Sequence, residues 1–264
     1  MWAPIALLAL AFTGAWPVPG APPHTLEDRF SPPVGFQRIA AAPGSFGAWS
    51  RQLPLLPEGS PVLLFNGDHK HRQDVHAAVL DLSVGKKDLQ QCADAVMRLK
   101  AEHLYANGRG KEIRFHFTNG FLADYARWRQ GERILVNGGH CRWVRSARPS
   151  DSHADLMSYL EQVFMYAGTL SLARELTAVG DAPMAPGDVF IQGGRPGHAV
   201  IVLDVARNAD GREVFLLAQS YMPAQQVHVL KNLAHPELGA WFERSTDRPL
   251  RTPEWDFEPT DLGR

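Results

Sequence analysis

Residues 187–219, GDVFIQGGRPGHAVIVLDVARNADGREVFLLAQ, decide the fold. This stretch contains three apolar runs, each separated from the next by a short segment rich in glycine, asparagine or aspartate. Short turns of this kind join neighbouring antiparallel strands. The stretch therefore predicts a meander with strands at 189–192, 198–205 and 214–219, and the apolar run 227–230 adds a fourth strand.

Two amphipathic helices are predicted before the meander. Each begins with a capping pattern, Asp88 with Gln91 in the first and Ser152 with Asp155 in the second. Apolar residues at helical spacing follow both caps; Asn107-Gly108 ends the first helix, and the second stops near residue 180. A strand at 75–84 precedes the first helix. Helices followed by a run of strands predict an α+β fold.

The segment 111–148 interrupts this plan. Alternating apolar residues predict a short strand at 113–117, and 121–129 reads as a short helical piece. Residues 133–136 and 141–144 predict a hairpin around Asn137-Gly138. We therefore expect one domain over 34–264, with an insertion near 111–148.

The composition excludes several classes of protein. The 264 residues include 27 basic and 28 acidic side chains, for a net charge of −1, and 45% are hydrophobic. These proportions are typical of a globular chain, and without a Lys/Arg block they argue against a nucleic-acid partner. Gly108-Arg109-Gly110-Lys111 lacks the spacing of a phosphate-binding loop. No cofactor is predicted.

The amino terminus predicts export. Residues 1–15 contain an apolar run followed by small residues, as in a signal peptide, and 16–33 reads as a proline-rich linker. No other run approaches the length of a membrane-spanning helix, so we expect no integral membrane segment after signal removal. The expected location is periplasmic or extracellular.

The two cysteines, Cys92 and Cys141, allow three interpretations. In an exported protein they can form one disulfide, or Cys92 can be a small core side chain on its helix. The third interpretation is a nucleophile, because N–H groups at a helix start favour the thiolate. His198 opens a strand after a glycine-rich loop, and Gln219 on the next strand could hold its imidazole.

The order of these parts resembles a known class of enzymes. The strand series is similar to that of papain-like NlpC-type cell-wall cysteine peptidases and amidases. The resemblance implies a papain-like core with Cys92 as nucleophile, His198 as base and Gln219 as the orienting group. This sequence departs from the family pattern around the cysteine, where it reads Gln90-Gln91-Cys92-Ala93-Asp94. The strand resemblance rests on Gly187-Asp188-Val189-Phe190, His198-Ala199-Val200-Ile201-Val202 and Leu217-Ala218-Gln219-Ser220.

A second resemblance covers nearly the whole mature chain. The segments that carry it are Gln91-Cys92-Ala93-Asp94-Ala95, Phe117-Thr118-Asn119-Gly120, Tyr166-Ala167-Gly168-Thr169, Gly193-Gly194-Arg195-Pro196-Gly197-His198-Ala199 and Leu217-Ala218-Gln219-Ser220-Tyr221-Met222-Pro223-Ala224-Gln225. In these segments the sequence is similar to an exported bacterial family known as domain of unknown function 4846, which has no established activity.

The first functional hypothesis is an exported thiol hydrolase of amide or peptide bonds in cell-wall or envelope substrates. Arg195, Ser220 and Tyr221 are the candidate residues of its substrate groove. The rival is a non-catalytic envelope binding protein of the same fold. A third hypothesis is a zinc-dependent enzyme. It would use the cluster of His69, His71 and His76, because three convergent imidazoles can bind zinc. No metal is assigned under the first hypothesis.

Overall fold

The computed structural model describes residues 24–264, so the predicted signal peptide and the first part of the linker lie outside it. A short helix, α1 (Leu26–Arg29), begins inside the predicted linker. Its Leu26 is fully buried and belongs to the main hydrophobic core. Packed structure therefore begins before residue 34.

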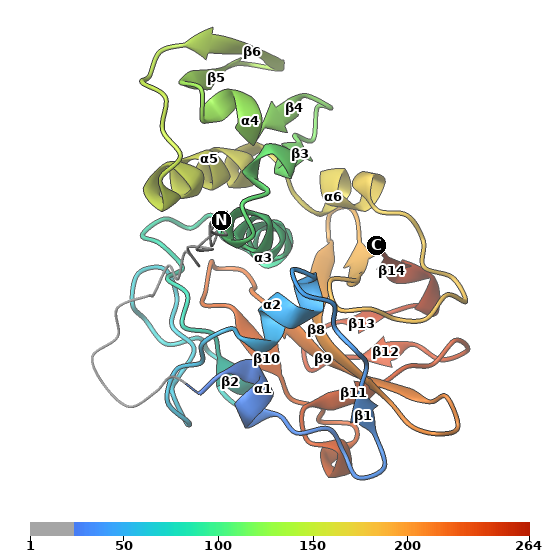
Figure 1. Ribbon diagram of the computed structural model, residues 1–264. Helices are drawn as coiled ribbons and strands as arrows, with labels where there is room; N and C mark the ends of the chain where they lie inside the picture. Colours follow the sequence, from blue (N-terminus) through green and yellow to red (C-terminus); the bar gives the residue numbers. More distant parts are fainter. Residues whose placement is uncertain (1–23) are drawn as a thin grey trace, which may run out of the picture.

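The centre of the molecule is one antiparallel sheet (Figure 1). Its strands follow the order β14-β7-β8-β9-β10-β2, while β1 pairs with β8 and β11 pairs with β9. The predicted meander is confirmed as its middle. The strands are β1 (Gln37–Arg38), β2 (His76–Val79), β7 (Val189–Gln192), β8 (His198–Arg207), β9 (Glu213–Gln219), β10 (His228–Leu230), β11 (Trp241–Glu243) and β14 (Leu262–Gly263).

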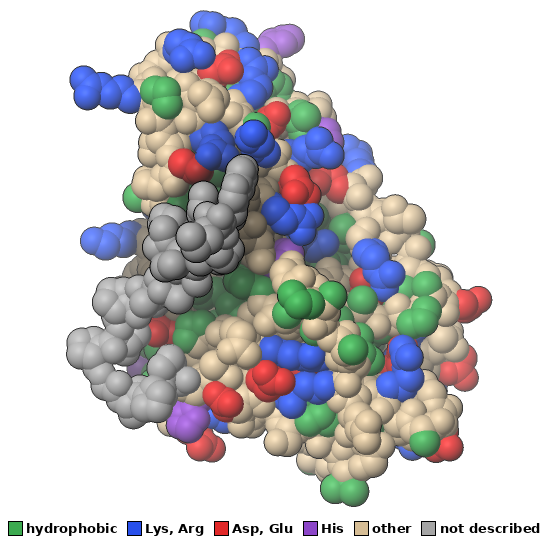
Figure 2. All heavy atoms as spheres, in the orientation of Figure 1, with side chains coloured by type: hydrophobic (Ala, Val, Ile, Leu, Met, Phe, Trp, Pro, Cys, Tyr) green, Lys and Arg blue, Asp and Glu red, His purple; other side chains and the backbone are tan. Residues whose placement is uncertain are grey.

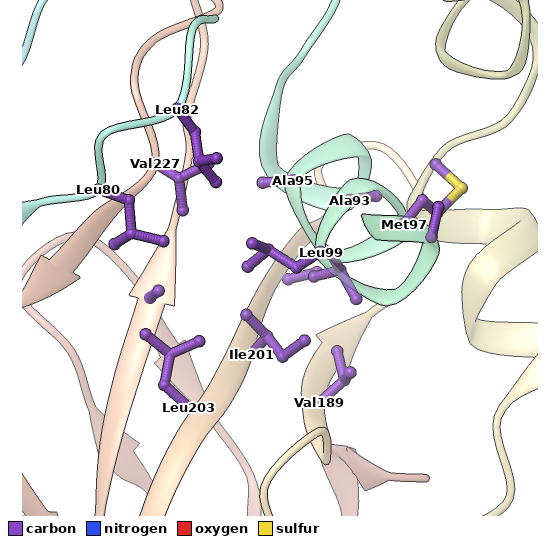
Figure 3. Close-up of a cluster of buried hydrophobic side chains, with 14 of the residues drawn as sticks. Leu80, Leu82, Ala93, Ala95, Met97, Leu99, Val189, Ile201, Leu203 and Val227 are labelled. Carbon is purple, nitrogen blue, oxygen red and sulfur yellow. The ribbon is translucent and has the colours of Figure 1, made fainter. Parts of the chain in front are cut away.

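Helices cover one face of this sheet, and irregular structure covers the other. On the first face α2 (Phe46–Arg51) and α3 (Cys92–Ala106) pack on β8, and α6 (Thr169–Glu175) packs on β7. Figure 3 shows Leu99 of α3 lying toward Ile201 of β8. The hairpin of β12 (Leu250–Arg251) and β13 (Asp256–Phe257) covers part of the other face. β8 is therefore buried on both faces.

A smaller lobe lies beyond α3, at the top of Figure 1. It contains the hairpin predicted around Asn137-Gly138, which is confirmed. Residues 111–148 carry eight basic and three acidic side chains, and Figure 2 shows Lys and Arg side chains over this end of the molecule. The lobe is formed by η1 (Gly110–Glu112), β3 (Arg114–His116), β4 (Leu122–Asp124), α4 (Tyr125–Trp128), β5 (Glu132–Asn137), β6 (His140–Arg145) and α5 (His153–Tyr166).

Three predicted boundaries are wrong, and a tertiary contact explains the first of them. Asp88 does not begin the first helix: its carboxylate accepts a hydrogen bond from the Ala224 N–H at 2.7 Å. Gln91 is the N-cap residue, and Cys92 becomes the first helical residue. The second helix breaks at Ala167 into α5 and α6. The strand expected at 75–84 ends at Val79.

The remaining short elements are the 3₁₀ turns at Pro236–Leu238 and Pro259–Asp261. Among the helices of residues 24–264, none has the length and apolar character needed to cross a bilayer.

Candidate active site

His198 and Gln219 meet at one end of the sheet. His198 is the first residue of β8 and Gln219 is the last residue of β9. In two neighbouring antiparallel strands the start of one lies beside the end of the other, so these two side chains lie at the same end of the sheet. The Nε2 atom of His198 lies 2.8 Å from Oε1 of Gln219, and both residues are about 1% exposed. The imidazole is therefore held as the sequence predicts.

Cys92 lies against the start of β8. The backbone N–H of Ala199, the residue after His198, hydrogen-bonds to its sulfur, as do N–H groups at the start of α3. The hydroxyl of Ser220 donates to the Gln90 carbonyl at 2.9 Å and so ties the end of β9 to the segment before this helix. The three predicted catalytic residues are thus contributed by one end of α3, β8 and β9.

Both cysteines are free thiols, so the disulfide interpretation is wrong. Cys92 is partly exposed and is not among the buried residues of the core. Cys141 lies on β6 in the lobe, where its sulfur accepts a hydrogen bond from the Asn119 amide at 3.3 Å. The Cys92 sulfur is therefore not held in a disulfide.

The three predicted groove residues have different environments. Ser220 is fully buried and its hydroxyl is used in hydrogen bonds to Gln90 and Gln225, so it does not line a groove. Tyr221 is partly exposed, and its ring centroid lies 4.7 Å from that of His198. Arg195 is exposed in the loop that leads to His198. Only Tyr221 and Arg195 remain candidates for substrate contact.

A polar chain continues behind Gln219, and sequence reasoning missed it. Nε2 of Gln219 donates to Oε2 of Glu254 at 2.6 Å, and Oε1 of Glu254 pairs with the Lys70 ammonium group at 2.6 Å. The same Nε2 lies 3.4 Å from Nε2 of His228, which is fully buried. Glu254 stands in no motif, and Lys70 lies between two histidines of the proposed zinc cluster, so no local signal links either residue to Gln219.

Aromatic rings enclose the imidazole. The Trp255 and Phe257 ring centroids lie 5.4 and 6.0 Å from that of His198, in addition to Tyr221. The indole N–H of Trp255 donates to Oε1 of Gln192 at 3.0 Å, which holds its ring in place. This apolar surround removes water from the imidazole and disfavours its charged form.

Burial keeps the thiol and the imidazole neutral. It lowers the pKa of His198 to about 4, although the Gln219 hydrogen bond opposes this shift. It raises the pKa of Cys92 to about 11, and the nearby Asp94 adds to the rise, while N–H groups of Ala93 and Ala199 oppose it. The expectation of a thiolate favoured by the helix start is therefore wrong, because desolvation outweighs those N–H groups.

Asp94, in the first turn of α3, is a buried carboxyl group. Its Oδ2 accepts the Gln91 N–H at 3.0 Å, while its Oδ1 has no hydrogen-bond partner within the described residues. Burial raises the pKa of Asp94 to about 8. At neutral pH the group next to the thiol is therefore mainly a carboxylic acid.

These buried groups predict a stability maximum near pH 6.5. Burial lowers the pKa values of His198 and His228 to about 4 and about 3. Below pH 6.5 the unfolded chain therefore takes up protons on these histidines before the folded chain does, and the free energy of unfolding decreases as the pH is lowered. Asp94 acts in the opposite direction, because its raised pKa makes the folded chain hold a proton up to about pH 8. Each group contributes roughly 1.4 kcal/mol per pH unit in its window.

Urea titrations at pH 5, 6.5 and 8 test this expectation. From pH 5 to 6.5 the two histidines outweigh Asp94, so the free energy of unfolding should rise; from pH 6.5 to 8 Asp94 should lower it. Asp94→Asn removes the decline above pH 6.5, whereas Asp247→Asn, at an exposed position, should retain it. A decline that persists in Asp94→Asn contradicts the assignment.

The histidine cluster does not form a metal site. His69 and His71 are exposed, and Nε2 of His76 lies 3.1 Å from the Ser60 carbonyl oxygen. Within residues 24–264 no group of three His, Cys, Asp or Glu side chains is close enough to hold a metal ion. The zinc-enzyme reading therefore lacks the convergence that it requires.

The fold and the site define an α+β protein in which a buried His–Gln pair and a partly exposed cysteine lie at one end of the central strands of an antiparallel sheet. The chain belongs to the family described as domain of unknown function 4846, whose model matches residues 26–264. No curated protein and no solved structure matches it.

Proposed function

We propose that this protein is an exported thiol hydrolase with a papain-like active site that cleaves an amide or peptide bond, in the cell wall or another envelope substrate. The observation that carries the proposal is the 2.8 Å hydrogen bond between His198 and Gln219 beside a cysteine at a helix start. A nucleophilic cysteine needs an adjacent imidazole, and that imidazole needs a third group to orient it.

In the proposed reaction the proton moves as the bond forms. His198 takes the proton of the Cys92 thiol while the sulfur attacks the substrate carbonyl carbon. The carbonyl oxygen becomes an oxyanion, which N–H groups at the start of α3 stabilise. The C–N bond then breaks, and the leaving amine takes the proton from His198. Water, deprotonated by His198, hydrolyses the thioester and regenerates the thiol.

Cys92 and His198 are both neutral before substrate binds, and this determines how the proton is transferred. Because the pKa of Cys92 lies far above that of His198, the resting pair is a thiol and an imidazole. His198 then acts as a general base in the transition state, a contribution of about 10²–10⁴ in rate. Tyr221 and the exposed Arg195 stand on the segments that flank His198 and Gln219, where a substrate would approach.

Trapping the thioester tests the proposal. The protein is incubated with muropeptides from purified cell wall and with a set of peptide amides, quenched in acid, and examined by intact mass spectrometry. We expect product release, and an acyl adduct on the wild type and on Cys141→Ala, the matched control that retains Cys92. Cys92→Ala should show neither.

The rival function is a non-catalytic binding protein. The raised pKa of Cys92 favours this function, because a buried thiol that stays protonated is typical of a structural cysteine and not of a nucleophile. Muropeptide binding by calorimetry that is equal in wild type and Cys92→Ala, with no product from any substrate, would support this function in place of the hydrolase.

A further inference from the structure

We propose that Glu254 and His228 are positioning residues that hold His198 in the tautomer with a proton on Nε2 and a free lone pair on Nδ1. This inference rests on the proposed function, because it supplies the base with the lone pair that accepts the thiol proton. It follows from the hydrogen-bonding capacity of each group in the chain behind Gln219.

His228 defines the first link. Its Nδ1 lies 2.9 Å from the Gln226 carbonyl oxygen, which can only accept a hydrogen bond. Nδ1 therefore carries the proton. Burial lowers the pKa of His228 to about 3, so the ring is neutral and its Nε2 presents a lone pair. That lone pair faces Nε2 of Gln219 at 3.4 Å.

Glu254 defines the second link. Its Oε2 lies 2.6 Å from Nε2 of Gln219, while Lys70 holds its Oε1. The amide nitrogen of Gln219 thus faces two acceptors and has two protons to give them. The reversed amide would place its oxygen against a carboxylate and a ring lone pair. The amide orientation is therefore determined by Glu254 and His228.

The orientation of Gln219 then decides the tautomer of His198. An amide oxygen only accepts, so Nε2 of His198, 2.8 Å from it, must carry the proton. The ring is neutral at pH 7, which leaves Nδ1 unprotonated. A neutral imidazole acts as a base through the nitrogen that has no proton. Glu254 and His228 thereby act on the reaction only through Gln219 and His198.

Nitrogen-15 NMR of histidine-labelled protein at pH 7 tests the chain without any substrate. Two-bond ¹⁵N–¹H spectra distinguish the tautomers, and His198→Gln and His228→Gln identify the two resonances. We expect Nε2–H for His198 and Nδ1–H for His228. The opposite tautomer at either ring in the wild type overturns the proposal.

Glu254→Gln provides the sharper test. The Lys70 ammonium group requires an acceptor, so the new amide should turn its oxygen to Lys70 and its NH₂ group to Gln219. The hydrogen bond from the charged Lys70 is stronger than the neutral 3.4 Å contact between Gln219 and His228, so it decides the orientation of both amides. Gln219 then reverses, and His198 should shift toward Nδ1–H by about tenfold in population. Glu58→Gln, at an exposed position, is the matched control and should change nothing.

The two hypotheses fail separately. A folded Glu254→Gln protein whose His198 keeps the wild-type tautomer overturns the positioning role. If this variant does not fold, the two wild-type tautomers still decide the question. Absence of hydrolysis on every substrate, with the expected tautomers present, rejects the hydrolase and leaves the hydrogen-bond chain as described.

Discussion

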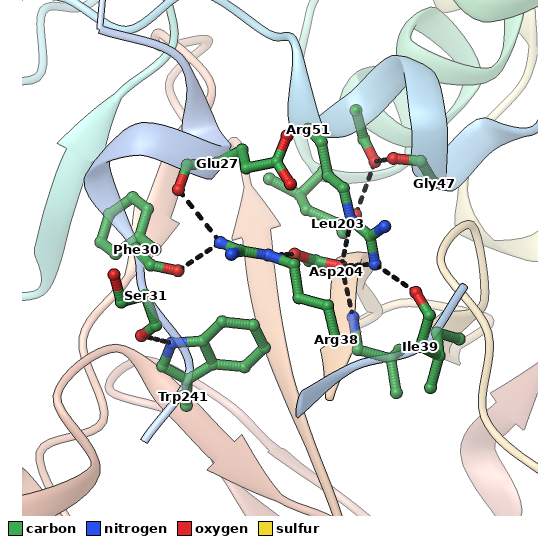
Figure 4. A network of polar contacts seen from close by, with 12 residues as sticks. Glu27, Phe30, Ser31, Arg38, Ile39, Gly47, Arg51, Leu203, Asp204 and Trp241 are labelled. Atoms are coloured by element: carbon green, nitrogen blue, oxygen red, sulfur yellow. Dashed lines mark hydrogen bonds and ion pairs between the residues drawn. The ribbon is translucent and has the colours of Figure 1, made fainter. Parts of the chain in front are cut away.

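Replacing Asp204 by alanine should lower the free energy of unfolding by about 3–5 kcal/mol, because it leaves two largely buried arginines without their partner. Asp204 is fully buried on β8 and binds two guanidinium groups (Figure 4). Its Oδ2 accepts from Arg38 Nε at 2.6 Å, and its Oδ1 accepts from Arg51 Nη2 at 2.8 Å. Urea unfolding of the variant measures the loss.

The position of Asp204 explains the size of this effect. The pairing of β8 with β9 shifts register between Val202 and Asp204. The Asp204 carboxylate binds Arg51, which is the last residue of α2. Arg38 also donates to the Glu27 and Phe30 carbonyls, and Arg51 donates to the Ile39 carbonyl. One carboxylate therefore joins α1, β1 and α2 to the central strand.

An exposed carboxylate is the appropriate control. The Asp247 side chain is 84% exposed and its Oδ1 lies 3.8 Å from Nε of Arg248, so Asp247→Ala should leave the free energy of unfolding nearly unchanged. A loss below 1 kcal/mol in Asp204→Ala itself would mean that its arginines find water or other acceptors, and the proposed role of the ion pair would be wrong.

Alkylation of Cys92 should be about a hundredfold slower at pH 8 in the folded protein than in the same chain unfolded in urea. Iodoacetamide reacts with the thiolate, and burial raises the pKa of this thiol from 9.0 to about 11. The folded rate should still rise about tenfold between pH 9 and 10, whereas the rate of the unfolded chain should level off.

Single-thiol proteins make this measurement specific. Cys141→Ala leaves Cys92 as the only cysteine, and Cys92→Ala reports Cys141 alone. The pH dependence separates a pKa effect from simple obstruction, because obstruction lowers the rate equally at every pH. Rapid labelling of Cys92 below pH 7 would show a resting thiolate and would contradict the neutral thiol–imidazole pair.

Local signals explain which parts of the fold were predictable. The meander, the hairpin at Asn137-Gly138 and the Ser152 cap depend on residues a few positions apart, and all three are confirmed. The predicted start of α3 is wrong because the Asp88 carboxylate accepts a hydrogen bond from the N–H of Ala224, 136 positions away. A capping pattern cannot register a competitor from so distant a part of the chain.

The candidate site divides in the same way. The ends of adjacent strands are a local matter, so His198 and Gln219 could be paired from their places in the meander. The polar loop around Ser220 predicts a groove residue, but the Ser220 hydroxyl is buried and donates to the Gln90 carbonyl. Glu254 reaches Gln219 from an irregular segment, and nothing in that segment's pattern indicates the contact.

The sequence by itself determined the order of the strands in the meander and the positions of His198 and Gln219 on it, because turns and strand alternation act over short distances. Only the tertiary structure decided the protonation of the site. The pKa values of Cys92 and His198 depend on how much water the surrounding chain removes. In the Lys70–Glu254–Gln219 chain of hydrogen bonds, Glu254 is 184 positions from Lys70 and 35 positions from Gln219. Desolvation and long-range hydrogen bonds exist only once the chain is packed.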